Sequence, residues 1–211
     1  MVWFDSMRKN PLVNNCYYHI FNRGNNKRPV FLDADDFHYF LDALKLFNCI
    51  ESLGYSSQYR RNKNQSESLV KVVAYCLNPN HFHLLLKQEY ESGISKYMQK
   101  ITTGYTMYFN KKYESSGSLF QGKFKSILVE DDAYLYHLSA YINLNFKIHG
   151  IDDPKMYRSS MAEYVDKPSF NICDNKIIVD NFSPEEYVNF AEKSAQSTLH
   201  LRSLQADILI E

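Results

Sequence analysis

Two histidines separated by one residue stand out in the segment Asn80-His81-Phe82-His83-Leu84. In a β-strand, residues two apart point to the same face, so His81 and His83 would present two imidazoles side by side. Two such imidazoles can supply two ligands to a divalent cation, while another element or water supplies the rest. The alternative interpretation is a pair of exposed or core histidines that bind no metal.

A second pair of chemically useful residues, Tyr141 and Asn145, lies four residues apart. If this segment is helical, both side chains lie on one face, and a hydroxyl and an amide oxygen approach the same point. That arrangement suits attack on a phosphodiester beside a metal ion. A tyrosine ordinarily has a pKa near ~10, so a metal or base must help it ionise. The alternative is that Tyr141 is one of many aromatic core residues, since the chain has 17 tyrosines.

Hydrophobic periodicity and turn residues predict the elements that must position these side chains. The predicted strands are residues 16–23, 69–77, 81–88 and 124–129, and the predicted helices are residues 33–53, 93–113 and 133–145. Asp131 and Asp132 are expected to cap the last of these helices. The order β-α-β-β-α-β-α predicts an α+β fold. Its first six elements form the split β-α-β pattern of a ferredoxin-like domain with a central antiparallel sheet, and the seventh carries Tyr141.

The pattern weakens after Gly150, where a helix over residues 184–195 with Ser183 as its N-cap is the clearest element. We therefore predict a catalytic domain over residues 1–150 and an acidic, mostly helical C-terminal extension over residues 151–211, packed on it. Residues 1–150 hold 18 lysines and arginines against 13 acidic residues, and residues 151–211 hold 6 against 11. This asymmetry hints at a basic working domain with an acidic tail, although the net charge is zero.

Composition narrows the class of protein. Hydrophobic residues make up 45% of the chain, as in an ordinary soluble globular protein. The four cysteines are widely spaced and form no CxxC pair, which favours reduced thiols. Neither an apolar signal core nor an apolar run of 18 residues occurs, so we expect a cytoplasmic protein that does not enter a membrane.

Several motifs occur in a fixed order along the chain. They are Tyr-His-Ile-Phe-Asn-Arg-Gly from residue 18, Phe-Leu-Asp-Ala-Asp-Asp-Phe from 31, Asn-Pro-Asn-His-Phe-His-Leu-Leu-Leu from 78, Gly-Ser-Leu-Phe-Gln-Gly-Lys-Phe-Lys-Ser from 117, Tyr-Ile-x-x-Asn from 141 and Tyr-Arg-Ser-Ser from 157. With them the chain resembles the REP-associated tyrosine transposases of the HUH class, which also includes the single-tyrosine transposases of simple insertion sequences. The resemblance covers residues 15–165 densely. One departure is Phe146-Lys147, where the family usually has Pro-Val; loss of the proline is expected to shift the helix end.

The resemblance implies a role for each chemical residue. His81 and His83 would be metal ligands, Asn145 the third ligand, and Mg²⁺ or Mn²⁺ the ion. Tyr141 would be the nucleophile that cleaves and rejoins single-stranded DNA near a hairpin, forming a 5′-phosphotyrosine and releasing a 3′-hydroxyl.

Polar and basic residues outside this group are expected to contact DNA. They are Arg23, Asn25, Lys27, Arg28, Arg60, Arg61, Lys123 and Lys125. The alternative is that the basic ones are solvated surface charges.

Two other functions stay open at this point. One is a DNA-binding protein on the same fold whose catalysis is lost or repurposed. The other is a small metallohydrolase built on His81-x-His83, which would need further histidine or carboxylate ligands and would form no covalent intermediate. Small single-tyrosine transposases resemble dimers with shared active sites, whereas REP-associated members resemble monomers with an added C-terminal segment. The acidic tail therefore favours a monomer, with a homodimer as the alternative.

Overall fold

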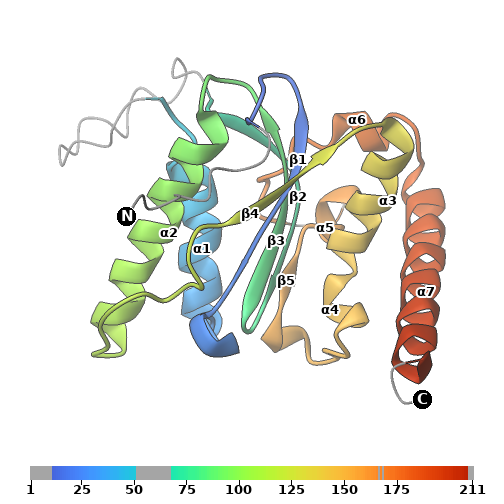
Figure 1. Cartoon of the computed structure of the whole chain (residues 1–211). Coiled ribbons are helices and arrows are strands. Elements are labelled where there is room, and N and C mark those ends of the chain that lie inside the picture. Colours follow the sequence, from blue (N-terminus) through green and yellow to red (C-terminus); the bar gives the residue numbers. More distant parts are fainter. Residues whose placement is uncertain (1–10, 51–67, 166, 168, 209–211) are drawn as a thin grey trace, which may run out of the picture.

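The computed structural model describes residues 11–50, 68–165, 167 and 169–208, with side chains as far as residue 200. Within these residues the fold is α+β, as predicted. A five-stranded antiparallel sheet lies between two layers of helices. Figure 1 shows α1 and α2 on one side of the sheet and α3, α4 and α7 on the other. None of the helices in the described part of the chain is both long and apolar enough to cross a membrane.

Five strands and four longer helices build these layers, joined by shorter helical turns. The strands are β1 Tyr17–Arg23, β2 Val70–Asn78, β3 His81–Gln88, β4 Lys125–Val129 and β5 Arg158–Ser159. The longer helices are α1 Ala34–Leu46, α2 Gly93–Lys112, α3 Asp132–Asn143 and α7 Pro184–Ile208. The short helical turns are η1 Asn25–Lys27, α4 Asn145–Ile148, η3 Pro154–Met156, α5 Met161–Tyr164 and α6 Lys176–Val179.

The strand order is β4-β1-β3-β2-β5. The first four strands have the ferredoxin-like order that the β-α-β-β-α-β pattern predicts. The fifth strand comes from the tail and pairs with the outer side of β2, where Cys76 faces Ser159 and Leu77 faces Arg158. The sequence did not predict this strand. It places part of the segment after residue 150 inside the sheet, while the division into two domains at that residue stays a prediction.

The sheet buries both of its faces because its strands alternate between two hydrophobic clusters. On β3, Phe82, Leu84 and Leu86 pack in the cluster formed with α1 and α2. Leu85 packs in the other cluster with α3, so His81 and His83 point toward α3 as well. A β-bulge between Val72 and Ala74 interrupts the alternation on β2, so that the consecutive residues Val73 and Ala74 both pack in the cluster with α3.

Several element ends differ from the sequence prediction. Helix α1 ends at Leu46 and not at residue 53, because the side chain of Asn48 binds the backbone N and O of Val70 and leads the chain toward β2. Helix α7 continues to residue 208, past the predicted end at 195, since no glycine or proline interrupts it there. Asn78, predicted as part of a turn, is the last residue of β2.

A buried polar network fixes α3 to the tail. Asn143 Nδ2 donates to the Tyr187 hydroxyl at 2.9 Å, and that hydroxyl donates to Ser139 Oγ at 3.0 Å. Ser160 Oγ donates to Asn143 Oδ1 at 2.5 Å. Buried polar groups cost little only when each is paired, so this network specifies one position for α3.

We expect Tyr187→Phe to lower the free energy of unfolding by about 1–3 kcal/mol, because it leaves the buried Asn143 Nδ2 without its acceptor. Urea unfolding followed by circular dichroism measures this. The matched control is Tyr134→Phe on the same side of the sheet, where the side chain is 39% exposed and the change should stay within about 0.5 kcal/mol. Equal midpoints for the two variants would contradict a stabilising role of the network.

Candidate active site

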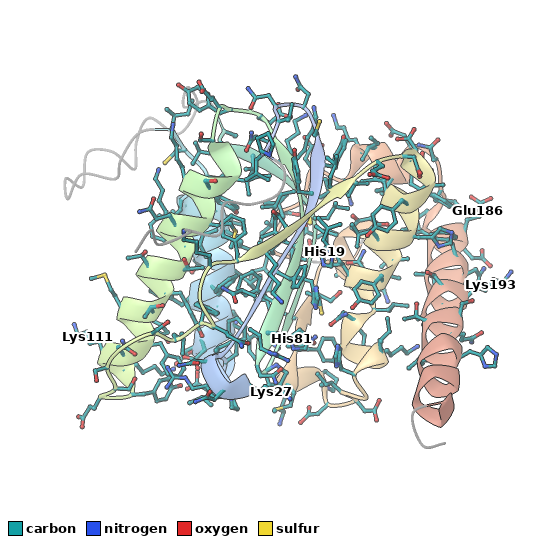
Figure 2. The ribbon with its side chains drawn as sticks, viewed as in Figure 1. His19, Lys27, His81, Lys111, Glu186 and Lys193 are labelled. Carbon is teal, nitrogen blue, oxygen red and sulfur yellow. The ribbon has the colours of Figure 1, made fainter. Side chains whose placement is uncertain are left out.

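Strand pairing places His81 and His83 on the face of the sheet that α3 and α4 cover. On β1, Arg23 faces His81 and Phe21 faces His83. The two imidazole rings are 5.2 Å apart and nearly perpendicular. Figure 2 shows His81 at the lower end of this face, beside α4. The sequence prediction of two imidazoles on one face therefore agrees with the geometry.

Asn145 joins this pair, although not from the helix that the sequence predicted. The prediction placed Tyr141 and Asn145 on one helix over residues 133–145, but α3 ends at Asn143 and Asn145 begins α4. Leu144 separates the two helices with a backbone conformation (φ −109°, ψ 17°) outside the α-helical range. Asn145 is fully buried, and its Oδ1 lies 3.2 Å from His81 Nε2.

The proton on His81 can be assigned from its neighbour Asn80. Asn80 Nδ2 donates to the backbone carbonyl of Lys27, which orients Asn80 Oδ1 toward His81 Nδ1 at 2.7 Å. An amide oxygen only accepts hydrogen bonds, so Nδ1 carries the proton and Nε2 carries the lone pair. That lone pair and Asn145 Oδ1 both face Asn78 Nδ2, at 2.9 Å and 2.7 Å.

These atoms fit a divalent cation with mixed nitrogen and oxygen ligands. Two ligands at right angles around a cation such as Mg²⁺ lie about 3 Å apart, close to the 3.2 Å between His81 Nε2 and Asn145 Oδ1. Asn145 Nδ2 is buried without a hydrogen-bond partner among the described residues. An unpaired buried amide costs about 1–3 kcal/mol, so Asn145 directs its oxygen toward His81 at the expense of its own NH₂ group. Among the described residues, no three His, Cys, Asp or Glu side chains group to hold a metal.

Tyr141 lies against the second histidine. Its ring is 5.8 Å from the His83 ring and 6.1 Å from the ring of His19, in edge contact with both. The structure therefore brings Tyr141, the two histidines and Asn145 to one place.

His19 contacts the same histidine through a hydrogen bond. Its Nε2 lies 2.8 Å from His83 Nδ1. Burial lowers the pKa of His19 to about 4, so this imidazole is neutral at neutral pH.

A groove of about 510 Å³ runs between α3 and α7 and reaches Tyr141. Tyr134 and Phe190 line its walls, and His19 also borders it. Burial, and then the Tyr141 hydroxyl, raise the pKa of Tyr134. Tyr141 is thus accessible from outside, whereas Asn145 is not.

The basic residues expected to bind DNA gather partly around His81. The loop after β1 and the loop before β4 are joined by backbone bonds from Asn25 to Leu119 and from Gln121 to Arg23. Arg23, Asn25, Lys27, Lys123 and Lys125 are exposed on or beside these loops. Figure 2 shows Lys27 below His81.

Arg28, Arg60 and Arg61 differ from that group. Arg28 is half-buried, with its guanidinium over the Phe109 ring and bonded to the Ser118 carbonyl, which is typical of a structural role. The predictions for Arg60 and Arg61 lie outside the described residues.

Three site residues were missed in the sequence. His19 lies within a quoted motif, but only strand pairing reveals its partner. Asn78 was assigned to a turn. His149, whose ring is 4.6 Å from that of His81, follows the helix predicted over residues 133–145, and no spacing rule singles it out.

Comparisons with known proteins were made on sequence and on structure. Residues 12–145 match the sequence model of a family described as "Transposase IS200 like". A solved structure of a REP-associated tyrosine transposase bound to a REP hairpin is similar in fold, with a TM-score of 0.53 and 16% identity over 85% of this chain and 96% of that chain. The tRNA(His) guanylyltransferase from Saccharomyces cerevisiae reaches a TM-score of only 0.38 at 8% identity, covering 92% of this chain and 80% of that chain, which is too low to support an argument. No curated protein sequence matches significantly.

We expect His81 to carry its proton on Nδ1 in the metal-free protein, as measured by the ¹⁵N chemical shifts of its imidazole. Asn80→Ala removes the 2.7 Å acceptor and should convert His81 into a mixture of tautomers. Any affinity for Mn²⁺ that uses His81 Nε2 should then fall about 10- to 100-fold. Asn110→Ala removes an amide on α2, on the other side of the sheet, and should change neither quantity. A wild-type His81 with its proton on Nε2 would contradict the assignment.

Proposed function

Because the chain belongs to the IS200-like transposase family, we propose that it cleaves and rejoins single-stranded DNA beside a hairpin, with Tyr141 as the nucleophile. The supporting observation is that Tyr141 lies against His83 while Asn145 Oδ1 lies against His81. Tyr141 borders both the groove and the imidazoles of His19 and His83, so a DNA strand that enters the groove can reach it. The similarity in fold to a transposase bound to a REP hairpin supports DNA of that shape as the substrate class.

Tyr141 is the nucleophile in strand cleavage and the leaving group in strand joining. Its hydroxyl loses a proton and its oxygen bonds to phosphorus, while the bond from phosphorus to the 3′ oxygen breaks. The 3′ oxygen takes up a proton, which leaves a 3′-hydroxyl on one DNA end and a 5′-phosphotyrosine on the other. A 3′-hydroxyl then attacks the phosphotyrosine, restoring the tyrosine and joining the two DNA ends.

We propose that His81 Nε2, Asn145 Oδ1 and one nitrogen of His83 hold Mg²⁺ or Mn²⁺. The ion supplies polarisation of the phosphate and stabilisation of negative charge on the leaving oxygen. Asn78 and Asn80 keep His81 and Asn145 oriented. Burial around Asn145 keeps bulk water away from its side of the proposed metal site. The groove leaves Tyr141 accessible to a DNA strand.

We propose that Arg23, Lys27, Lys123 and Lys125 contact phosphates, since they are exposed around the end of the sheet where His81 lies. Such contacts position the DNA without reading its sequence. Asn25 is exposed on the same loop and is proposed to contact DNA, and Arg60 and Arg61 are proposed as further contacts. For Arg28 we propose an indirect role, in which it supports the loop that carries the other contacts.

We propose that the protein works as a monomer, with a homodimer as the alternative. One chain supplies Tyr141, which lies against His83, and Asn145, which lies against His81. A second copy is therefore not needed to complete the site.

Tyr141→Phe should abolish the covalent protein–DNA adduct and reduce strand cleavage by at least about 10³-fold, because the attacking oxygen is gone. The measurement is a denaturing gel of protein incubated with a labelled single-stranded oligonucleotide that contains a hairpin. Tyr134→Phe, two turns earlier on α3, should still form the adduct. Hairpin binding by Tyr141→Phe should stay within a few-fold of wild type.

Two outcomes of this assay would reject the proposal. Hairpin binding without any adduct in the wild type favours the binding protein whose catalysis is lost or repurposed. Cleavage that persists in Tyr141→Phe, with no adduct in either protein, favours hydrolysis by activated water, as in the metallohydrolase alternative.

Chelation by EDTA should stop cleavage while hairpin binding persists, and added Mg²⁺ or Mn²⁺ should restore it. His81→Ala should weaken Mn²⁺ binding by at least about 100-fold, because losing a ligand costs more than losing a supporting partner, which costs about 10- to 100-fold. His38→Ala on α1, an exposed histidine in the opposite helical layer, serves as the control and should bind Mn²⁺ as wild type does. Undiminished cleavage in EDTA would contradict metal dependence.

A further inference from the structure

A third imidazole, that of His19, is built into the face that carries His81 and His83. His19 lies on β1, two residues from Phe21, which is the direct partner of His83 across the strands. Diagonal neighbours of this kind are within reach of each other's side chains. His19 Nε2 lies 2.8 Å from His83 Nδ1, and the two rings are stacked with centroids 5.0 Å apart. His19 is only 6% exposed, so this contact is not a surface accident.

The two nitrogens that meet here must play opposite roles. A neutral imidazole has one donor nitrogen and one acceptor nitrogen, so either His83 donates to His19 or the reverse holds. The same choice is already settled for His81, whose Nδ1 donates to Asn80 Oδ1 and leaves Nε2 facing Asn145. His19 occupies the corresponding position at Nδ1 of His83, although it comes from a different strand.

We propose that His19 is a positioning residue that accepts the Nδ1–H of His83 and so turns His83 Nε2 toward the cation. The part of this proposal that concerns the cation rests on the proposed function. The tautomer of His83 is inferred from its hydrogen bond to His19 and does not depend on that function.

The position of His19 gives this role a second consequence. Its ring is also 6.1 Å from the ring of Tyr141, in edge contact. One side chain therefore touches both the histidine that would hold the cation and the tyrosine that would attack the phosphate. The hydrogen bond between His19 and His83 therefore has a role beyond packing, because it orients a proposed ligand next to the proposed nucleophile.

The test compares His19→Gln, whose side-chain oxygen can still accept a hydrogen bond, with His19→Phe, which keeps a ring of similar shape and accepts none. In the metal-free full chain, the imidazole ¹⁵N shifts of His83 should report Nδ1–H in wild type and in His19→Gln. In His19→Phe they should report loss of that single tautomer. This readout needs neither metal nor DNA, so it stands or fails separately from strand cleavage.

Mn²⁺ binding followed by electron paramagnetic resonance gives the second measurement. His19→Phe should bind Mn²⁺ about 10- to 100-fold more weakly than wild type, and His19→Gln should recover most of that loss. Phe21→Leu is the matched control, because Phe21 stacks on His83 at 5.7 Å without a hydrogen bond. It should leave the tautomer unchanged and Mn²⁺ affinity within about threefold.

Three results would overturn the proposal. In the first, wild-type His83 carries its proton on Nε2. In the second, the number of imidazole nitrogens bound to Mn²⁺ falls by one in His19→Gln, which would make His19 a ligand itself. In the third, His19→Phe and Phe21→Leu weaken Mn²⁺ binding equally, which would reduce His19 to packing. Should His19→Phe not fold, the wild-type tautomer and the nitrogen count in His19→Gln still decide.

Discussion

The alternation of side chains along β3 constrains every other part of this site. Phe82, Leu84 and Leu86 are buried among the side chains of α1 and α2, so His81 and His83 must point the other way. A slip of one residue in the pairing of β3 would turn both imidazoles into the apolar cluster with α1 and α2, and would turn the leucines out of that cluster. The core thus holds the register, and the register places the imidazoles. The positions of His81 and His83 therefore depend on hydrophobic burial on the opposite face of the sheet, the one that α1 and α2 cover.

On the face of the sheet that carries the imidazoles, a polar network holds the helix that brings other side chains to them. Tyr141 and Asn145 reach them because α3 is fixed by the buried network of Asn143, Ser160 and Tyr187. Ser160 and Tyr187 both follow residue 150, so the acidic tail helps to hold α3 in the position that the site requires. The orphaned Nδ2 of Asn145 is consistent with this arrangement, since such a cost persists only where the surroundings fix the side chain.

The sequence predicted those features that follow from local rules. Period-two alternation predicted the facing of His81 and His83, and the order of elements predicted the ferredoxin-like sheet. Features that depend on tertiary contacts were missed. Strand β5 has two residues and forms only because β2 offers an edge. His19 and His83 are 64 positions apart, and no spacing rule links them before the strands are paired. The early end of α1 likewise depends on a bond from Asn48 to a strand 22 residues away.

The replacement of the family's usual proline by Phe146 shows how site and tail are joined. Phe146 is the second residue of the short helix α4, which follows the end of α3 at Asn143 and runs to Ile148. A proline is tolerated in the first turn of a helix, so the replacement does not by itself set a helix end here. The ring of Phe146 then stacks on Tyr157 at 3.7 Å, nearly parallel. Tyr157 directly precedes β5, so this stack connects the segment that carries Asn145 to the edge of the sheet. The residue that departs from the family pattern therefore contributes an aromatic contact, and this contact ties the segment that carries Asn145 to the tail.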